Sequence, residues 1–207
     1  MTVRRVRVSI SQAAIHEALD RARRRAANLR GANHDGESHN GYRRYSVGYV
    51  GEEGFEQWLI DERIPKAQSG VIGYTHYKSD KHVSMGSEFE VGGYKIEIKG
   101  GGEPHHDSMI IGGSRDLSAA IFVNLVTVDP DYTVGDWDLC AWWTRAEVES
   151  RPADRMFKGS LCRFVPSSAA TREFIDLARL LRKECGVPEV VAPKAVTADD
   201  YRRAKGI

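Results

Sequence analysis

Charged and apolar side chains alternate over residues 87–100, which read SEFEVGGYKIEIKG. The central pair of glycines predicts a two-residue hairpin turn. In the register that this turn sets, Glu90 lies opposite Lys95 and Glu88 lies opposite Glu97. The first pair is attractive, whereas two opposed glutamates repel each other. A divalent cation between Glu88 and Glu97 is the explanation that we favour, because hard cations take carboxylate oxygens as ligands.

Lys99 lies two residues beyond Glu97, on the same face of the expected hairpin. An ammonium group beside a metal ion can orient or polarise an attacking water molecule. The three side chains together therefore indicate metal-assisted hydrolysis. The simpler interpretation is a solvated hairpin with mixed charges and no ligand, and the hairpin sequence alone does not distinguish the two.

A helix expected over residues 49–64, ended by the proline that follows, supplies a candidate third carboxylate. At 100° per residue, the rings of Phe55 and Trp58 share its apolar face. Glu52 lies at the edge of that face, whereas Glu53 lies nearly opposite. Glu52 is therefore the candidate, and the alternative role for it is a first-turn glutamate that favours the helix dipole.

These motifs, in this order, resemble those of the PD-(D/E)XK nuclease superfamily, which has the restriction-endonuclease-like fold. In such proteins an acidic residue precedes a hairpin whose second strand ends in (D/E)-x-K, here Glu88 and then Glu97-Ile98-Lys99. Many members also carry a glutamate on an earlier helix, as in Gly48-Tyr49-Val50-Gly51-Glu52. The resemblance covers about residues 48–148. It includes the apolar run Ile121–Val128 and the segment Trp142–Glu147, which look like the later core strands of such nucleases. Glu88 stands where aspartate is usual and no proline precedes it, so Glu90 remains an alternative ligand.

The resemblance implies a fold and an activity. The fold is α/β, with a mixed central sheet of four or five strands flanked by helices. The activity is Mg²⁺-dependent hydrolysis of DNA phosphodiester bonds, by an endonuclease or exonuclease in which Mn²⁺ can substitute. Glu88, Glu97 and the Ile98 carbonyl would ligate the metal, Glu52 would complete the shell, and Lys99 would position water. The alternatives are a nuclease-like module that binds nucleic acid or a partner without turnover, and an interaction domain with an accidental hairpin resemblance.

The N-terminal region is strongly basic. Residues 1–30 contain eight arginines against Glu17 and Asp20, a net charge of +6, so that −5 remains for residues 31–207. Such a segment can contact phosphates, although an arginine-rich solvated helix face has the same composition. The candidate DNA-binding residues are Arg21, Arg23, Arg24, Arg25 and Arg115. A homodimer is expected by analogy, because two chains can cut two strands.

Apolar periodicity and capping signals predict the remaining elements. They are a strand over Val6–Ile10, a helix from Ser11 to about Arg30, a buried strand over Ile121–Val128, a strand over Trp137–Trp143 with a T-x-x-E capping box after it, and a helix from Ser167 or Ser168 to about Gly186. We expect an N-terminal extension and linker (1–40), a nuclease-like core (41–190) and a tail (191–207). Residues 100–116 are glycine-rich and polar, and predict a substrate loop that includes His105 and His106.

Composition excludes several classes of protein. The longest apolar runs are a handful of residues, far short of the roughly 20 that span a bilayer. The three cysteines are widely separated, which argues against a disulfide framework and a zinc finger. Since no secretion signal is visible at the N-terminus, we expect a cytoplasmic protein.

Overall fold

The computed structural model describes residues 4–30, 38–78, 88–102, 108–113, 117–127, 135–157 and 159–188. Its nine strands form one sheet of six, in the order β1-β7-β6-β4-β3-β2, and one of three, in the order β5-β9-β8. The strands are β1 (Val6–Ser9), β2 (Tyr74–His76), β3 (Phe89–Val91), β4 (Tyr94–Gly102), β5 (Ser108–Gly112), β6 (Ile121–Thr127), β7 (Asp136–Thr144), β8 (Arg155–Phe157) and β9 (Ser160–Pro166). The helices are α1 (Gln12–Arg30), α2 (Ser38–Asp61), α3 (Arg145–Glu149) and α4 (Phe174–Glu184).

The fold is α/β with a mixed central sheet, as predicted, because β4 and β6 are parallel and the other neighbouring strands are antiparallel. The prediction of four or five strands is wrong, since the central sheet has six. The additional strands lie at its two edges. We expected β1 in an N-terminal extension, but it pairs with β7. At the other edge, β2 has only three residues and pairs with β3.

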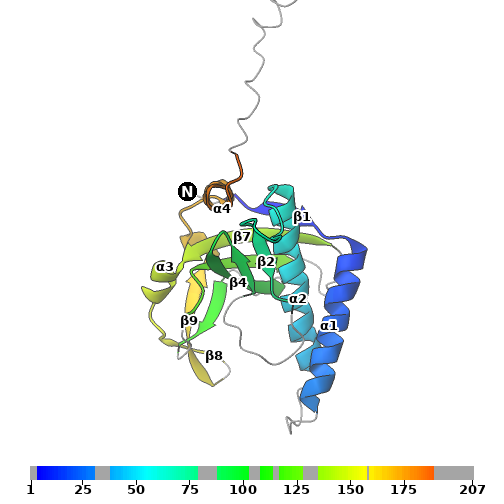
Figure 1. The fold of residues 1–207 in the computed structure, drawn as a ribbon. Helices are drawn as coiled ribbons and strands as arrows, with labels where there is room; N and C mark the ends of the chain where they lie inside the picture. Colours follow the sequence, from blue (N-terminus) through cyan, green and yellow to red (C-terminus); the bar gives the residue numbers. More distant parts are fainter. Residues whose placement is uncertain are drawn as a thin grey trace, which may run out of the picture.

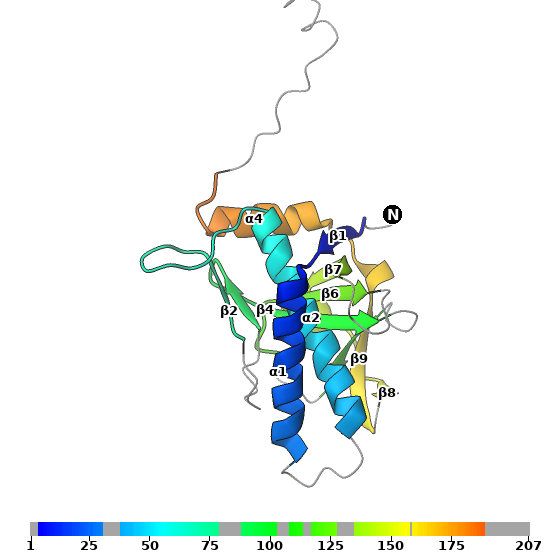
Figure 2. The same ribbon diagram turned by 90° about the vertical axis from the view of Figure 1, so that its right-hand side faces the viewer.

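Helices cover one face of the central sheet. α2 packs against β4, and α1 runs alongside α2 (Figures 1 and 2). α4 lies across one end of α2, where Arg182 donates a hydrogen bond of 2.9 Å to the carbonyl of Glu62. The hydrophobic core on this side joins side chains of β1, α1, α2, α4 and the central strands, including Ile15, Phe55 and Val123. The described N-terminal residues therefore share the core of the rest of the protein.

The three-stranded sheet covers the other face. Phe122 of β6 and Trp143 of β7 meet Met109 of β5 and Val165 of β9 in a second hydrophobic cluster. The neighbours of Phe122 along β6 point into the helix-covered core instead. The prediction that this strand is buried on both faces is confirmed, because all seven of its residues are buried.

Helix boundaries differ from the sequence pattern at two places. α2 begins at Ser38, 11 residues before the expected start, because burial against α1 outweighs the helix-weakening glycines along it. α4 begins at Phe174, with Glu173 as its N-cap, while residues 167–169 form a short 3₁₀ helix. The Ser11 cap is confirmed by a 3.2 Å hydrogen bond from the Ala14 N–H to the hydroxyl. Of the described helices, none is long and apolar enough to cross a membrane.

The expected hairpin is confirmed in its register. Phe89 pairs with Ile96, and Val91 pairs with Tyr94, across a turn in which both glycines have positive φ angles of 53° and 84°. The strand after the turn continues to Gly102, and residues 108–112 form β5. Part of the expected substrate loop is therefore strand.

Candidate metal centre

The β3–β4 hairpin brings together three of the predicted site residues, Glu88, Glu97 and Lys99, which we call the hairpin site. The regular register ends at the pair of Phe89 and Ile96, and the Glu88 N–H donates a 3.1 Å hydrogen bond to the Ile96 carbonyl, so Glu88 lies beside the start of the segment that carries Glu97. The Glu88 carboxylate accepts a 3.0 Å hydrogen bond from the backbone N–H of Ile98, and Lys99 forms an ion pair with Glu97. The Glu97 side chain is 1% exposed and that of Lys99 is 27% exposed, so Lys99 connects a buried carboxylate with solvent.

Glu88 is in an environment that disfavours its negative charge. Burial is the main reason why its pKa is raised to about 7, and the carboxylates of Glu97 and Glu52 raise it further. Lys99 and the hydrogen bond from the Ile98 N–H act in the opposite direction but do not cancel these effects. At neutral pH the site therefore gains from an additional positive charge.

The donor set fits a hard divalent cation such as Mg²⁺, because it consists of carboxylate oxygens. Glu90, the alternative ligand, has partners outside the site: it pairs with Lys95 in the register and accepts a 2.8 Å hydrogen bond from the Tyr77 hydroxyl. The side chain of Ile98 is buried in the core. The role of its carbonyl as a ligand stays a prediction.

A close approach of α2 to β4 positions the third carboxylate. A Cβ atom at Gly100 would lie 2.5 Å from the carbonyl oxygen of Val47, and one at Gly51 would lie 3.3 Å from the Cα of Gly100. Glycine at both positions therefore allows the helix backbone to rest on the strand. Glu52 follows Gly51 directly, and its charge consequently acts on Glu88.

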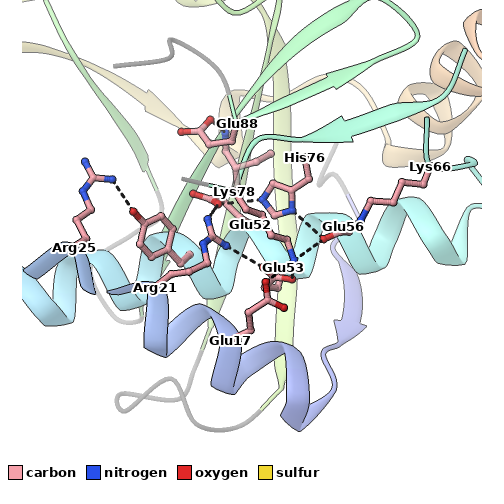
Figure 3. A network of polar contacts seen from close by, with 12 residues as sticks. Glu17, Arg21, Arg25, Glu52, Glu53, Glu56, Lys66, His76, Lys78 and Glu88 are labelled. Carbon is pink, nitrogen blue, oxygen red and sulfur yellow. Dashed lines mark hydrogen bonds and ion pairs between the residues drawn. The ribbon is translucent and has the colours of Figure 1, made fainter. Parts of the chain in front are cut away.

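Glu52 also belongs to a second group of charges, shown in Figure 3, which we call the helix cluster. Its members are Glu52, Glu53 and Glu56 of α2, Arg21 of α1, His76 of β2, and the two lysines Lys66 and Lys78, which lie outside the strands and helices. All three glutamates are buried. The helical pattern placed Glu53 opposite the apolar face, and it is nevertheless buried because α1 covers that side of α2.

Arg21 is an interior residue of this cluster. Its guanidinium donates hydrogen bonds of 2.8 Å to Glu52 and 3.1 Å to Glu53, and stacks on the ring of Tyr49 at 4.2 Å. The residue is only 3% exposed. The prediction that Arg21 contacts phosphate is not supported by this position, because buried carboxylates bind its guanidinium.

His76 lies between two carboxylates (Figure 3). Its Nε2 is 3.1 Å from Glu52 and its Nδ1 is 2.9 Å from Glu56. Burial alone would lower the pKa of His76, but these two hydrogen bonds and the surrounding carboxylate charges outweigh burial and raise it. The pKa of Glu56 is lowered despite burial, because His76 and Lys66 donate hydrogen bonds to it.

The helix cluster also offers a geometrically suitable set of metal ligands. One ligand atom from each of Glu53, Glu56 and His76 lies within 4.8 Å of the others. The Lys78 ammonium, however, lies 3.0 Å from Glu53 and 3.3 Å from Glu56. The Lys78 ammonium thus contacts both glutamates, and Arg21 and Lys66 contact one each, whereas at the hairpin site the pKa of Glu88 stays raised beside Lys99.

The other predicted DNA-binding arginines of α1 are divided between its faces. Arg23 and Arg24 are exposed, and Arg23 forms an ion pair with Asp20. Arg25 is half-buried and donates a 3.0 Å hydrogen bond to the Tyr49 hydroxyl. Three further candidates, Arg115, His105 and His106, lie outside the described residues.

Comparison of the chain with protein-family models, with curated proteins and with solved structures finds no match. The function therefore has to be inferred from side-chain geometry. The structure brings Glu88, Glu97 and Lys99 together, and the negative charge of Glu52 helps to raise the pKa of Glu88. His76, which bonds both Glu52 and Glu56, and Lys78, which pairs with Glu53 and Glu56, were not foreseen from the sequence.

Proposed function

We propose that the protein is a Mg²⁺-dependent DNA nuclease of the PD-(D/E)XK type, with a restriction-endonuclease-like core. The observation that carries the proposal is the meeting of two hairpin glutamates, Glu88 and Glu97, with Lys99, next to a helix that carries Glu52. Because β4 is a central strand paired with β3 and β6, Glu97 and Lys99 stand on a rigid element, as a catalytic constellation requires.

Each residue has a distinct role in this proposal. Glu88 and Glu97 hold the metal, with the Ile98 carbonyl as a further ligand, and Glu52 completes the shell directly or through water. When bound, Mg²⁺ or Mn²⁺ supplies Lewis-acid activation of a phosphodiester and of water. Lys99, which is partly exposed beside Glu97, orients the attacking water and stabilises the charge that grows on the scissile phosphate.

The substrate is DNA, bound in part by the exposed face of α1. Arg23 and Arg24 are exposed there and neutralise phosphates, so we expect binding to weaken as salt increases. Arg115 is a further phosphate contact in this proposal. A homodimer would allow both strands of a duplex to be cut. We propose a cytoplasmic location.

A second candidate function is DNA binding without turnover. It is favoured by the long side chain of Glu88, where the resembling nucleases have aspartate, and by the ion pair that Lys99 already forms with Glu97. Such a module needs no metal. Neutralising Glu97 would then leave DNA binding unchanged.

Cleavage of a DNA panel tests the proposal. Plasmid, linear, single-stranded and branched DNA are incubated with the protein in Mg²⁺, Mn²⁺ or EDTA. Glu97→Gln should abolish cutting, whereas Glu90→Gln, on the same hairpin but bonded to Tyr77, should leave it nearly unchanged. Metal-dependent cutting that survives Glu97→Gln would refute the assigned site. Binding without cutting in any metal would favour the second candidate.

A further inference from the structure

The imidazole of His76 is fixed in place by hydrogen bonds at both of its nitrogens. The side chain is fully buried. Nε2 lies 3.1 Å from the Oε2 atom of Glu52, and Nδ1 lies 2.9 Å from the Oε2 atom of Glu56. Because ionised carboxylate oxygens accept hydrogen bonds, the protonated ring donates from both nitrogens. Two such bonds on opposite sides of one ring fix its orientation.

The same ring is tied to the hairpin that carries Glu88. His76 pairs with Phe89 across β2 and β3, and the two rings stack with centroids 4.1 Å apart and planes 18° from parallel. Phe89 also packs edge-on against Phe55 of α2, at a centroid distance of 5.0 Å. Because Phe89 follows Glu88 in the chain, the position of His76 is set relative to the hairpin site.

One oxygen of Glu52 receives two donors. Besides His76, the Nη2 atom of Arg21 donates to Oε2 at 2.8 Å. Both bonds end on Oε2 of the carboxylate. The other oxygen, Oε1, is therefore the one that can bind a metal ion or a metal-bound water. Arg21 comes from α1 and His76 from β2, but only the His76 ring is stacked on the strand that follows Glu88.

We propose that His76 is a positioning residue, which sets the place of the Glu52 carboxylate relative to Glu88 and Glu97 through its hydrogen bond and its stacking on Phe89. This inference rests on the proposed metal-dependent function. His76 does not touch the metal or the substrate in this role. It acts through Glu52, as an outer hydrogen-bond partner orients a metal-ligating carboxylate.

Binding of Mn²⁺ to the purified, DNA-free protein tests the inference with a readout other than cleavage. The electron paramagnetic resonance signal of free Mn²⁺ gives the dissociation constant. His76→Phe keeps a ring for stacking and removes both donors, while His76→Gln retains one amide donor for Glu52. Lys66→Met is the matched control, because Lys66 contacts Glu56 at 2.8 Å in the same cluster without bonding Glu52.

We expect His76→Phe to weaken Mn²⁺ binding about 10- to 100-fold, His76→Gln to restore part of the loss, and Lys66→Met to match the wild type. Adding His76→Phe to Glu52→Gln should cost no further affinity, because His76 acts through Glu52. A purely structural His76 would lower the melting temperature and leave the dissociation constant unchanged.

The outcomes separate this inference from the proposed function. Wild-type affinity in both folded His76 variants would overturn the positioning role and leave the metal site standing. Absence of Mn²⁺ binding to the wild-type protein would overturn both. If neither variant folds, nitrogen NMR of the wild-type protein decides: Mg²⁺ should shift the ring resonances of His76, and unchanged resonances would overturn the inference.

Discussion

The hairpin site contains one buried and one partly buried glutamate and the helix cluster three buried ones, and the two balance charge differently. In the helix cluster, three glutamates are surrounded by Arg21, Lys66, Lys78 and His76. At the hairpin site, the charges that act most strongly on Glu88 are one lysine and two further carboxylates. In the first, the pKa of Glu56 is lowered, although burial raises that of Glu53 in spite of its Lys78 partner, whereas in the second the pKa of Glu88 is raised to about 7.

This difference distinguishes the helix cluster from the site that we propose to be functional. Basic side chains of the protein itself contact all three glutamates of the helix cluster. The cluster can therefore hold α1, α2 and β2 together without a bound metal ion. At the hairpin site the environment of Glu88 disfavours its negative charge, and a bound cation would offset this effect. Glu52 belongs to both, since Arg21 and His76 bind it while its charge acts on Glu88.

The largest expected effect is on catalysis at the hairpin site. Lys99→Ala should lower the cleavage rate about 10²- to 10⁴-fold, because a positioned general acid–base or electrostatic group is lost. Folding and DNA affinity should change little, since the Lys99 side chain is partly exposed. Single-turnover cleavage and DNA binding are measured beside Lys95→Ala, which faces Glu90 in the same hairpin. Retained turnover would remove Lys99 from the mechanism.

The next largest effect is on stability in the helix cluster. Arg21→Met should reduce the free energy of unfolding by about 3–5 kcal/mol, because it leaves Glu52 and Glu53 buried without their guanidinium partner. Urea unfolding measures this change. Glu97→Gln at the hairpin site should have a small or stabilising effect in EDTA, because it removes a repulsive charge near Glu88. Equal losses in the two variants would contradict the distinction between the clusters.

The hairpin could be predicted from sequence because its determinants are local. A glycine pair with positive φ angles and strict alternation fix the register between Phe89 and Ile96. The Ser11 cap and the Thr144–Glu147 capping box are confirmed for the same reason. In each case the interacting groups lie within ten residues of one another, so the pattern itself contains the contact.

The helix cluster could not be predicted because its contacts are long-range. Arg21 reaches Glu52 from 31 residues away, and His76 reaches it from 24 residues away. A partial signal existed for Arg21, which falls at the edge of the stripe of buried residues that includes Ala18 and Ala22. His76 stands in a three-residue strand, too short for an alternating pattern to indicate which side chains are buried.

The pH dependence of stability gives a smaller, site-specific effect. The pKa of Glu88 rises from 4.5 to about 7 on folding, so the folded state binds this proton more tightly than the unfolded chain. Stability contributed by protonated Glu88 is therefore present below about pH 4.5 and lost as pH rises through 7. In EDTA, the free energy of unfolding of the wild type should fall between pH 5 and pH 8. In Glu88→Gln this fall should be smaller by about 1–3 kcal/mol.

Urea unfolding at the two pH values measures this difference, and subtracting the variant from the wild type removes the contributions of other groups. The helix cluster supplies the contrast. Glu56 has a lowered pKa, so its contribution is present at neutral pH and lost only in acid. Parallel pH profiles for wild type and Glu88→Gln would show that Glu88 is not under electrostatic strain.

The smallest expected effect separates the two faces of α1. Arg24 is exposed, so Arg24→Ala should change the free energy of unfolding by no more than about 0.5 kcal/mol, in contrast to Arg21→Met on the buried face. If Arg24 contacts phosphate, the variant should weaken DNA binding uniformly across sequences and reduce the slope of log affinity against log salt by about 1. An unchanged salt slope would show that Arg24 makes no phosphate contact. The DNA would then have to bind another face of the protein.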